Sequence, residues 1–253
     1  MDHQGRLEFP GLPEACLISG TETAQRFLAS AYDSVEDLFD WHQSANDLAE
    51  EDHKIDPELG SRTRESAQDM LRSMIVFAGA GIDAVLKQLI RESLEPLVSK
   101  SELASQKLSE FVEARLDPAA RGSVKRLTRY LLSPSPRQAL IEDYVLDLTG
   151  SSLQSVAQLD RALSGLGVLD RNLRRRCKEL QPLFEARNEI VHELDLLELD
   201  TPGDRHRRTR TMTQSVDLAH LGLEIGQLII NAVGALLESN AELEGPEPEP
   251  KQG

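Results

Sequence analysis

The sequence has few cysteines, few aromatic residues and no long uninterrupted apolar run. Its two cysteines, Cys16 and Cys177, stand far apart and in no spacing typical of a metal site. We therefore expect neither a disulfide framework nor a zinc site. Aromatic residues make up 4% of the chain and hydrophobic residues 40%, so the core must consist mainly of aliphatic side chains. That composition favours packed helices over sheets.

Two further absences bear on location. No segment approaches the roughly 18 consecutive apolar residues typical of a transmembrane helix. The first residues, 1–6, lack the basic-then-apolar pattern of a signal peptide. We therefore expect a cytoplasmic protein that does not contact a membrane. The length of 253 residues suits one large domain or two small ones.

Apolar residues recur at helical spacing through most of the chain, and no run alternates as a strand would. Pro57 and Gly60 indicate a loop between the first two long helices, and Pro96 indicates the end of the second. The expected helices cover residues 21–48, 61–94, 101–116, 121–133, 137–148, 151–165, 170–194 and 211–239.

This pattern predicts an all-α fold, an up-and-down helical bundle with a helical insertion in the middle. We expect an extended N-terminal arm over residues 1–20 and the helical domain over 21–240, with the insertion at about 100–168. Residues 241–253 are acidic and rich in proline, a composition typical of disorder.

An arginine, a side-chain amide and a histidine occur within six consecutive residues, at Arg187, Asn188 and His192. The arginine fork matches phosphate oxygens, and a histidine can transfer protons. On a helix, Asn188 and His192 share a face, whereas Arg187 lies about 140° from His192. Either the long arginine side chain wraps around the helix, or a second copy of the helix completes the site.

Arg-Asn-x-x-x-His in an all-helical chain resembles the R-x4–6-H signature of HEPN domains, a helical family with many toxin and defence ribonucleases. Residues 190–195 also resemble that family's motif helix. The segment 79–87 resembles its small-residue second helix, and 150–168 resembles the segment before the motif helix in larger members, such as the RiboL-PSP and MAE types. The resemblance extends over roughly residues 21–240, and only the hexapeptide is specific.

The resemblance implies a metal-independent endoribonuclease of a toxin or antiviral-defence system, with no cofactor. The RNA 2′-hydroxyl would attack its own phosphate and leave 2′,3′-cyclic phosphate and 5′-hydroxyl ends. His192 would transfer the proton, Arg187 would stabilise the charged phosphorane, and Asn188 would hold the substrate or orient His192. Glu193 and Asp195 are supporting residues that would hold the imidazole in one tautomer.

The family resemblance also implies a homodimer in which two motif helices meet across a composite cleft. Some HEPN toxins are silenced by modification of a tyrosine two residues after the motif histidine. Leu194 stands at that position, which argues against this mode of control. A protein antitoxin of another kind, or a defence partner, remains compatible with the sequence.

The net charge of −15 is unusual for a protein that binds RNA, because phosphate binding depends on basic surface. Two basic clusters flank the motif, and we expect them to contact RNA. The residues expected to bind RNA are Arg174, Arg175, Arg176, Lys178, Arg205, Arg207 and Arg208, and the clusters also include Arg171, His206 and Arg210. The alternative is a solvated helix face and a basic loop.

Two other interpretations remain. Residues 79–84 match the pattern G-x-G-x-x-A of a dinucleotide-binding turn. Because the residues before them are helical in pattern, we interpret them as helix positions where a neighbour packs closely. The second is a catalytically silent HEPN-like module that binds or dimerises in a defence or toxin–antitoxin complex, and this module would tolerate His192→Ala.

Overall fold

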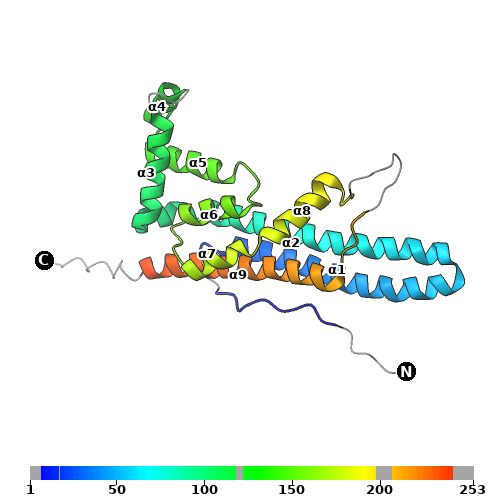
Figure 1. Ribbon diagram of the computed structural model, residues 1–253. Helices are drawn as coiled ribbons and strands as arrows, with labels where there is room; N and C mark the ends of the chain where they lie inside the picture. The colour runs from blue at the N-terminus through cyan, green and yellow to red at the C-terminus, as the bar shows by residue number, and fades with distance from the viewer. Residues whose placement is uncertain (1–6, 17, 118–121, 198–206, 242–253) are drawn as a thin grey trace.

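The computed structural model describes residues 7–16, 18–117, 122–197 and 207–241 (Figure 1). Within these ranges the chain is all-helical, as predicted, and its one strand-like feature is an isolated antiparallel bridge between Leu196 and Arg207. The helices are α1 (Glu22–Ile55), α2 (Pro57–Lys100), α3 (Glu102–Leu116), α4 (Ser123–Leu131), α5 (Pro136–Thr149), α6 (Val156–Gly165), α7 (Arg171–Lys178), α8 (Gln181–Glu193) and α9 (Met212–Ala241).

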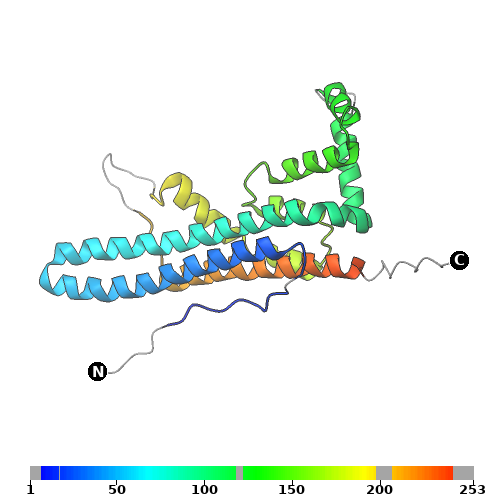
Figure 2. The same ribbon diagram turned by 180° about the vertical axis from the view of Figure 1, so that it is seen from behind.

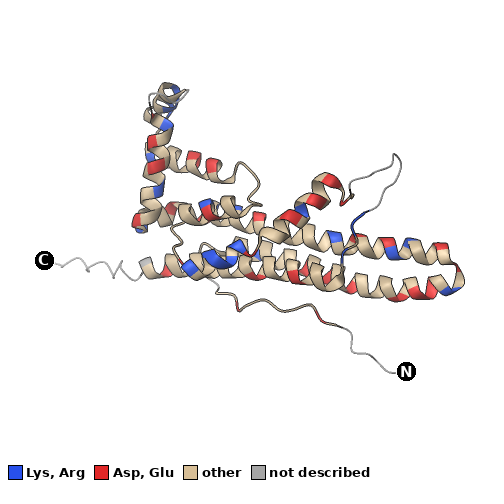
Figure 3. Cartoon of the chain, in the orientation of Figure 1, with Lys and Arg blue, Asp and Glu red and all other residues tan. Residues whose placement is uncertain are grey.

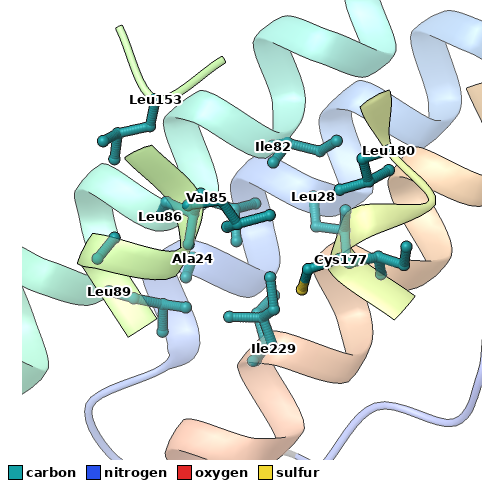
Figure 4. Packing of buried hydrophobic residues seen from close by; sticks show 14 of the residues in the cluster. Ala24, Leu28, Ile82, Val85, Leu86, Leu89, Leu153, Cys177, Leu180 and Ile229 are labelled. Atoms are coloured by element: carbon teal, nitrogen blue, oxygen red, sulfur yellow. The ribbon is translucent and has the colours of Figure 1, made fainter. Parts of the chain in front are cut away.

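Helices α1, α2 and α9 lie side by side and form the long body of the protein (Figures 1 and 2). α1 and α2 make an antiparallel hairpin, and α9 runs in the same direction as α2. Aliphatic side chains from all three helices meet in the core, among them Leu28, Ile82 and Ile229, each of which is fully buried (Figure 4). This burial is the main source of stability for a bundle with so few aromatic residues.

The turn between α1 and α2 is one residue long, and the loop predicted at this position is wrong. The Asp56 carboxylate accepts a hydrogen bond from the Glu58 amide at 2.9 Å, and Pro57 occupies the first helical position. Proline suits that position because its missing N–H is not needed there. A Cβ on Gly60 would lie 2.7 Å from the backbone of His53, so glycine allows the two helices to approach this closely.

The predicted end of α2 before Pro96 is also wrong, because the helix continues through the proline to Lys100. Proline removes one backbone hydrogen bond from the helix. Leu94, Leu97 and Val98 remain buried on both sides of it. Their burial keeps the segment helical against the local preference of the proline.

Helices α3 to α6 project from the end of α2 as a separate group (Figure 1). They pack on one another through apolar side chains such as Leu148, Leu159 and Leu163, all of which are buried. The Ser155 side chain accepts a hydrogen bond from the Gln158 amide and caps α6, so this helix begins a few residues later than predicted.

The described part of the N-terminal arm, residues 7–16 and 18–20, lies extended along the bundle. Phe9 is buried and makes edge-to-face contacts with Tyr32, Phe39 and His220. The His220 ring also hydrogen-bonds the Gly11 carbonyl at 3.0 Å. The arm thus covers the seam between α1 and α9. The predicted disordered tail falls almost entirely on residues 242–253, which lie outside the described residues.

Two helices are long and apolar enough to cross a membrane, by length and composition alone: Pro57–Lys100 and Met212–Ser239. In each, 56% of the most apolar window is buried inside the protein. Core helices of a soluble protein pass the same test, so this is a weak indication of a membrane location.

The small residues of 79–84 lie in the middle of α2, which confirms the close-packing interpretation and excludes a strand-to-helix turn. A Cβ on Gly81 would lie 2.6 Å from the Ala31 Cβ of α1. A Cβ on Gly79 would lie 3.4 Å from the Arg187 Cγ of α8, an ordinary contact. The two glycines therefore differ sharply in the space beside them.

We expect Gly81→Ala to lower the free energy of unfolding by about 1–3 kcal/mol, because the overpacked helices must separate. Gly79→Ala is the matched control and should be neutral or stabilise by up to about 1 kcal/mol, since alanine is the better helix former. Urea denaturation followed by circular dichroism measures both. Equal effects of the two substitutions would contradict this account of the helix contact.

Candidate functional site

The motif residues lie on α8, which rises obliquely from the bundle (Figure 1). The single helix predicted over 170–194 is wrong, because the chain turns at residues 179–180 and divides it into α7 and α8. Pro182 stands in the first turn of α8. Its ring favours a new helix start over continuation of the previous helix.

The first half of α8 is fixed by close packing against α2 and α9. Leu183 and Phe184 are buried, and a Cβ on Gly222 of α9 would lie 2.7 Å from a Leu183 methyl carbon. One turn later, the aliphatic stem of Arg187 passes over Gly79 of α2. The beginning of the motif helix is therefore fixed by its contacts with α2 and α9.

The Arg187 guanidinium is directed toward Asn188, whose Oδ1 accepts a hydrogen bond from Nη1 at 3.0 Å. Nε of Arg187 is buried and has no hydrogen-bond partner among the described residues. An unpaired buried N–H is unusual and costly. The arginine thus has a donor that a ligand oxygen would satisfy.

His192 and Asn188 are exposed and lie four residues apart on α8, so they share one face. No hydrogen bond or ion pair of His192 occurs within the described part of the chain. The Arg187–Asn188 hydrogen bond brings the guanidinium toward the face that carries His192. This contact partly overcomes the angle that separates the two residues on an ideal helix.

Asp195 follows α8 and is buried in a cluster of ion pairs. Its Oδ2 accepts hydrogen bonds from Arg72 Nε and Arg210 Nε, both at 3.1 Å, and its Oδ1 accepts one from Arg210 Nη2 at 2.6 Å. Arg210 also contacts Glu189 of α8 at 2.9 Å. This cluster ties the end of α8 to α2 and to the segment before α9.

Burial alone would raise the pKa of Asp195, but the hydrogen bonds and charges of Arg210 and Arg72 lower that pKa below its ordinary value. Burial likewise disfavours the charged form of Arg210, but Asp195 and Glu189 raise its pKa. Asp195 and Arg210 therefore remain charged and paired.

The expectation that Asp195 supports the His192 imidazole is corrected by this geometry. Leu194 and Asp195 take left-handed backbone conformations, with φ of 54° and 59°, and the chain turns under the helix. The Asp195 carboxylate therefore faces Arg72 and Arg210 instead of His192. The Glu193 side chain is exposed and makes no hydrogen bond or ion pair with the described residues, so its supporting role stays a prediction.

In the first basic cluster, two of the four members predicted to bind RNA are engaged in ion pairs. Arg174 pairs with Asp160 at 2.9 Å, and Arg176 makes a two-pronged pair with Glu224 of α9. Arg175 and Lys178 are exposed, and the described chain gives them no partner. These two residues retain the charge that phosphate binding requires.

The described arginines of the second cluster form ion pairs with acidic residues of α2 and α8. Arg207 contacts Asp69 at 2.6 Å, and Arg208 contacts Glu189 at 3.3 Å. Arg205 lies outside the described residues. Figure 3 shows acidic residues distributed along α1 and α2, next to the segment that carries these arginines. Contact of this cluster with RNA stays a prediction.

The ion-pair roles of Arg72, Arg210 and Glu189 were not predicted from the sequence, which indicates Arg210 only as a member of a basic cluster. Arg72 interrupts the apolar pattern of α2 at a buried position, and this is the one local signal that it has a partner. Nothing local indicates that the partner is Asp195, 123 residues away.

Comparison with known proteins gives no match: no family model, no curated protein and no solved structure corresponds to this chain. The class of protein that the structure itself defines is an all-α protein with an Arg-Asn-x-x-x-His helix.

We expect Asp195→Asn to lower the free energy of unfolding by about 3 kcal/mol at pH 7, because it leaves two buried arginines undercompensated. The exposed fractions of the Arg210 and Asp195 side chains are 4% and 0%, so water cannot replace the lost partner. Since the pKa of Asp195 is lowered in the folded protein, its contribution is complete above the ordinary value of 3.8 and disappears as the pH falls below that value.

The difference between wild type and Asp195→Asn, measured by urea denaturation from pH 7 to pH 3, should therefore be constant at first and shrink below about pH 4. Glu193→Gln removes an exposed charge two residues away and should change stability by less than about 0.5 kcal/mol. The same unfolding midpoint for Asp195→Asn and wild type would refute the anchoring role.

Proposed function

We propose that this protein is a metal-independent endoribonuclease of the HEPN type, with Arg187, Asn188 and His192 as its catalytic residues. The observation that carries the proposal is the state of these side chains on α8. His192 and Asn188 are exposed, and Arg187 has a donor without a partner. A buried N–H without a partner is rare in a helix of purely structural function.

The groups on α8 have the chemistry that RNA cleavage by its own 2′-hydroxyl requires. The exposed His192 imidazole accepts the proton of the attacking hydroxyl or donates one to the leaving oxygen. The Arg187 guanidinium neutralises the charge on the phosphorane. Asn188 already orients the arginine, so its amide also positions the substrate.

The rigidity of α8 supports a catalytic role as well. Its first half packs on Gly79 and Gly222, and its end is tied down through Asp195. A site on a helix fixed at both ends holds its groups within the small tolerance that catalysis needs. The requirement for a 2′-hydroxyl makes the proposed activity specific for RNA.

A second copy of the chain completes the proposed site. The Arg187–Asn188 hydrogen bond closes only part of the angle of about 140° between Arg187 and His192 on a regular helix, so one copy would supply the arginine and its partner the histidine. Positive charge from Arg175 and Lys178 of α7 would guide RNA to an otherwise acidic protein. The proposal includes a cytoplasmic location, where cellular RNA is accessible. It also includes a role in a toxin or defence system, in which the protein has a protein partner.

We expect the purified protein to cleave cellular RNA in EDTA and to leave 2′,3′-cyclic phosphate ends. His192→Ala and Arg187→Ala should each reduce the rate at least about 100-fold, because each removes a group that acts on the transition state. Cleavage is followed by gel electrophoresis, and the ends are identified by their resistance to phosphatase until acid opens the cyclic phosphate.

His53→Ala and Arg64→Ala remove exposed residues of the same types from the α1–α2 hairpin, and both should cleave as wild type does. Equal cleavage by His192→Ala and wild type would place the activity elsewhere. No cleavage by wild type would contradict the ribonuclease and favour the silent binding module.

The composite site has its own test in a mixture of two inactive variants. When Arg187→Ala and His192→Ala subunits exchange at random, half of the dimers are mixed, and one of the two sites in each mixed dimer is intact. Activity should then return to about a quarter of wild type. Each variant alone stays inactive. No recovery after proven subunit exchange would assign both residues to one chain.

A further inference from the structure

A pocket of 640 Å³ opens among α3, α4, α5 and α6, in the group of helices that projects from the bundle (Figure 1). Each of the four helices contributes to its wall. The volume lies within the range of about 300–1,000 Å³ that is typical of small-molecule sites. None of the residues assigned to the ribonuclease site lines this pocket, so it requires an explanation of its own.

The pocket has an excess of positive charge. Four of the side chains that line it are basic and two are acidic: Lys107, Arg115, Arg126, Arg161, Glu110 and Asp147. In a chain with a net charge of −15, such a concentration of basic side chains is a local exception. Figure 3 shows basic residues on α3, α4 and α6 around this region. The pocket therefore suits an anion.

One carboxylate arranges two of the arginines. Arg115 Nη2 lies 2.6 Å from Oδ1 of Asp147, and Arg161 pairs with the other oxygen of the same carboxylate. A guanidinium group has five N–H donors, and each of these contacts uses a single one. Asp147 thus holds two guanidinium groups next to each other with donors to spare. Paired guanidinium groups are well suited to bind phosphate oxygens.

Tyr144 adds a neutral donor to the same pocket. Its side chain is buried, with 5% of the residue exposed, and its ring packs against Phe111 with a centroid distance of 4.8 Å. The hydroxyl lines the pocket without a hydrogen-bond partner among the described residues. Burial raises the pKa of Tyr144 to about 12, so the hydroxyl keeps its proton at neutral pH.

Gly165 keeps the space beside this hydroxyl open, because a Cβ there would lie 3.0 Å from the Tyr144 oxygen. The unpartnered hydroxyl and the two arginines line one pocket, which a single bound group can contact.

We propose that this pocket binds a small molecule that carries a phosphomonoester. A phosphomonoester has a charge close to −2 at neutral pH, and Arg115 and Arg161 share the single carboxylate of Asp147, so part of their positive charge is available to it. Arg115, Arg161 and the Tyr144 hydroxyl donate hydrogen bonds to its oxygens. The apolar surface of Phe111 and Ala114 contacts the organic part of the molecule. This site is independent of the proposed ribonuclease activity.

Isothermal titration calorimetry of the full chain with AMP, inorganic phosphate and adenosine tests the proposal. AMP should bind saturably, inorganic phosphate more weakly, and adenosine not measurably. Tyr144→Phe and Arg161→Ala should each raise the Kd for AMP about tenfold or more, since each loses a hydrogen bond to a charged group. Tyr144→Phe keeps the ring that packs on Phe111, so it removes the hydroxyl without disturbing the fold.

Arg129→Ala is the matched control, because Arg129 is an exposed arginine that pairs with Asp143 and does not line this pocket. It should bind AMP as wild type does. Three results would each overturn the proposal: no saturable binding of AMP or phosphate at millimolar concentration, equal affinity for AMP and adenosine, or wild-type affinity in both Tyr144→Phe and Arg161→Ala. Circular dichroism of each variant verifies that it is folded.

Discussion

The buried Asp195 carboxylate is the point where three parts of the chain are joined. It accepts hydrogen bonds from Arg72 of α2 and from Arg210 before α9, and Arg210 in turn binds Glu189 of α8. Charges removed from water are stable only when they are fully paired. The position of the motif helix therefore depends on a small set of ion pairs as well as on apolar packing, and the exposed motif side chains stand on a fixed support.

Much of the helical architecture could be predicted from the sequence, because it follows from periodic apolar residues and from local caps. The spacing of apolar residues predicted the helices apart from the division of residues 170–194 into α7 and α8, and the small residues around Gly81 indicated a close helix contact. The errors arose at Pro57, Pro96 and Pro182, where the local preference of proline alone did not decide the outcome. Pro57 and Pro182 lie in the first turns of helices, and at Pro96 the buried neighbours kept the helix intact.

The candidate site was less predictable than the fold. Arg187, Asn188 and His192 could be chosen from their chemistry and spacing. The role of Asp195 could not be predicted. The spacing on an ideal helix placed Asp195 near His192, whereas the left-handed conformation of Leu194 turns Asp195 away from that histidine. The ion pairs of Arg174, Arg176 and Arg208 were equally hidden, since their acidic partners lie on other helices or come from distant parts of the sequence.

The same anchoring has a consequence for the order of folding. The α1–α2 hairpin closes over a single residue, so its contacts are local and form early. Asp195 and its partner Arg72 are 123 residues apart, and the second partner, Arg210, comes later still. During synthesis the hairpin is complete long before the ribosome has made Arg210. The motif helix therefore becomes fixed near the end of folding, and the newly made chain passes through a stage in which the α1–α2 hairpin exists and the candidate site does not.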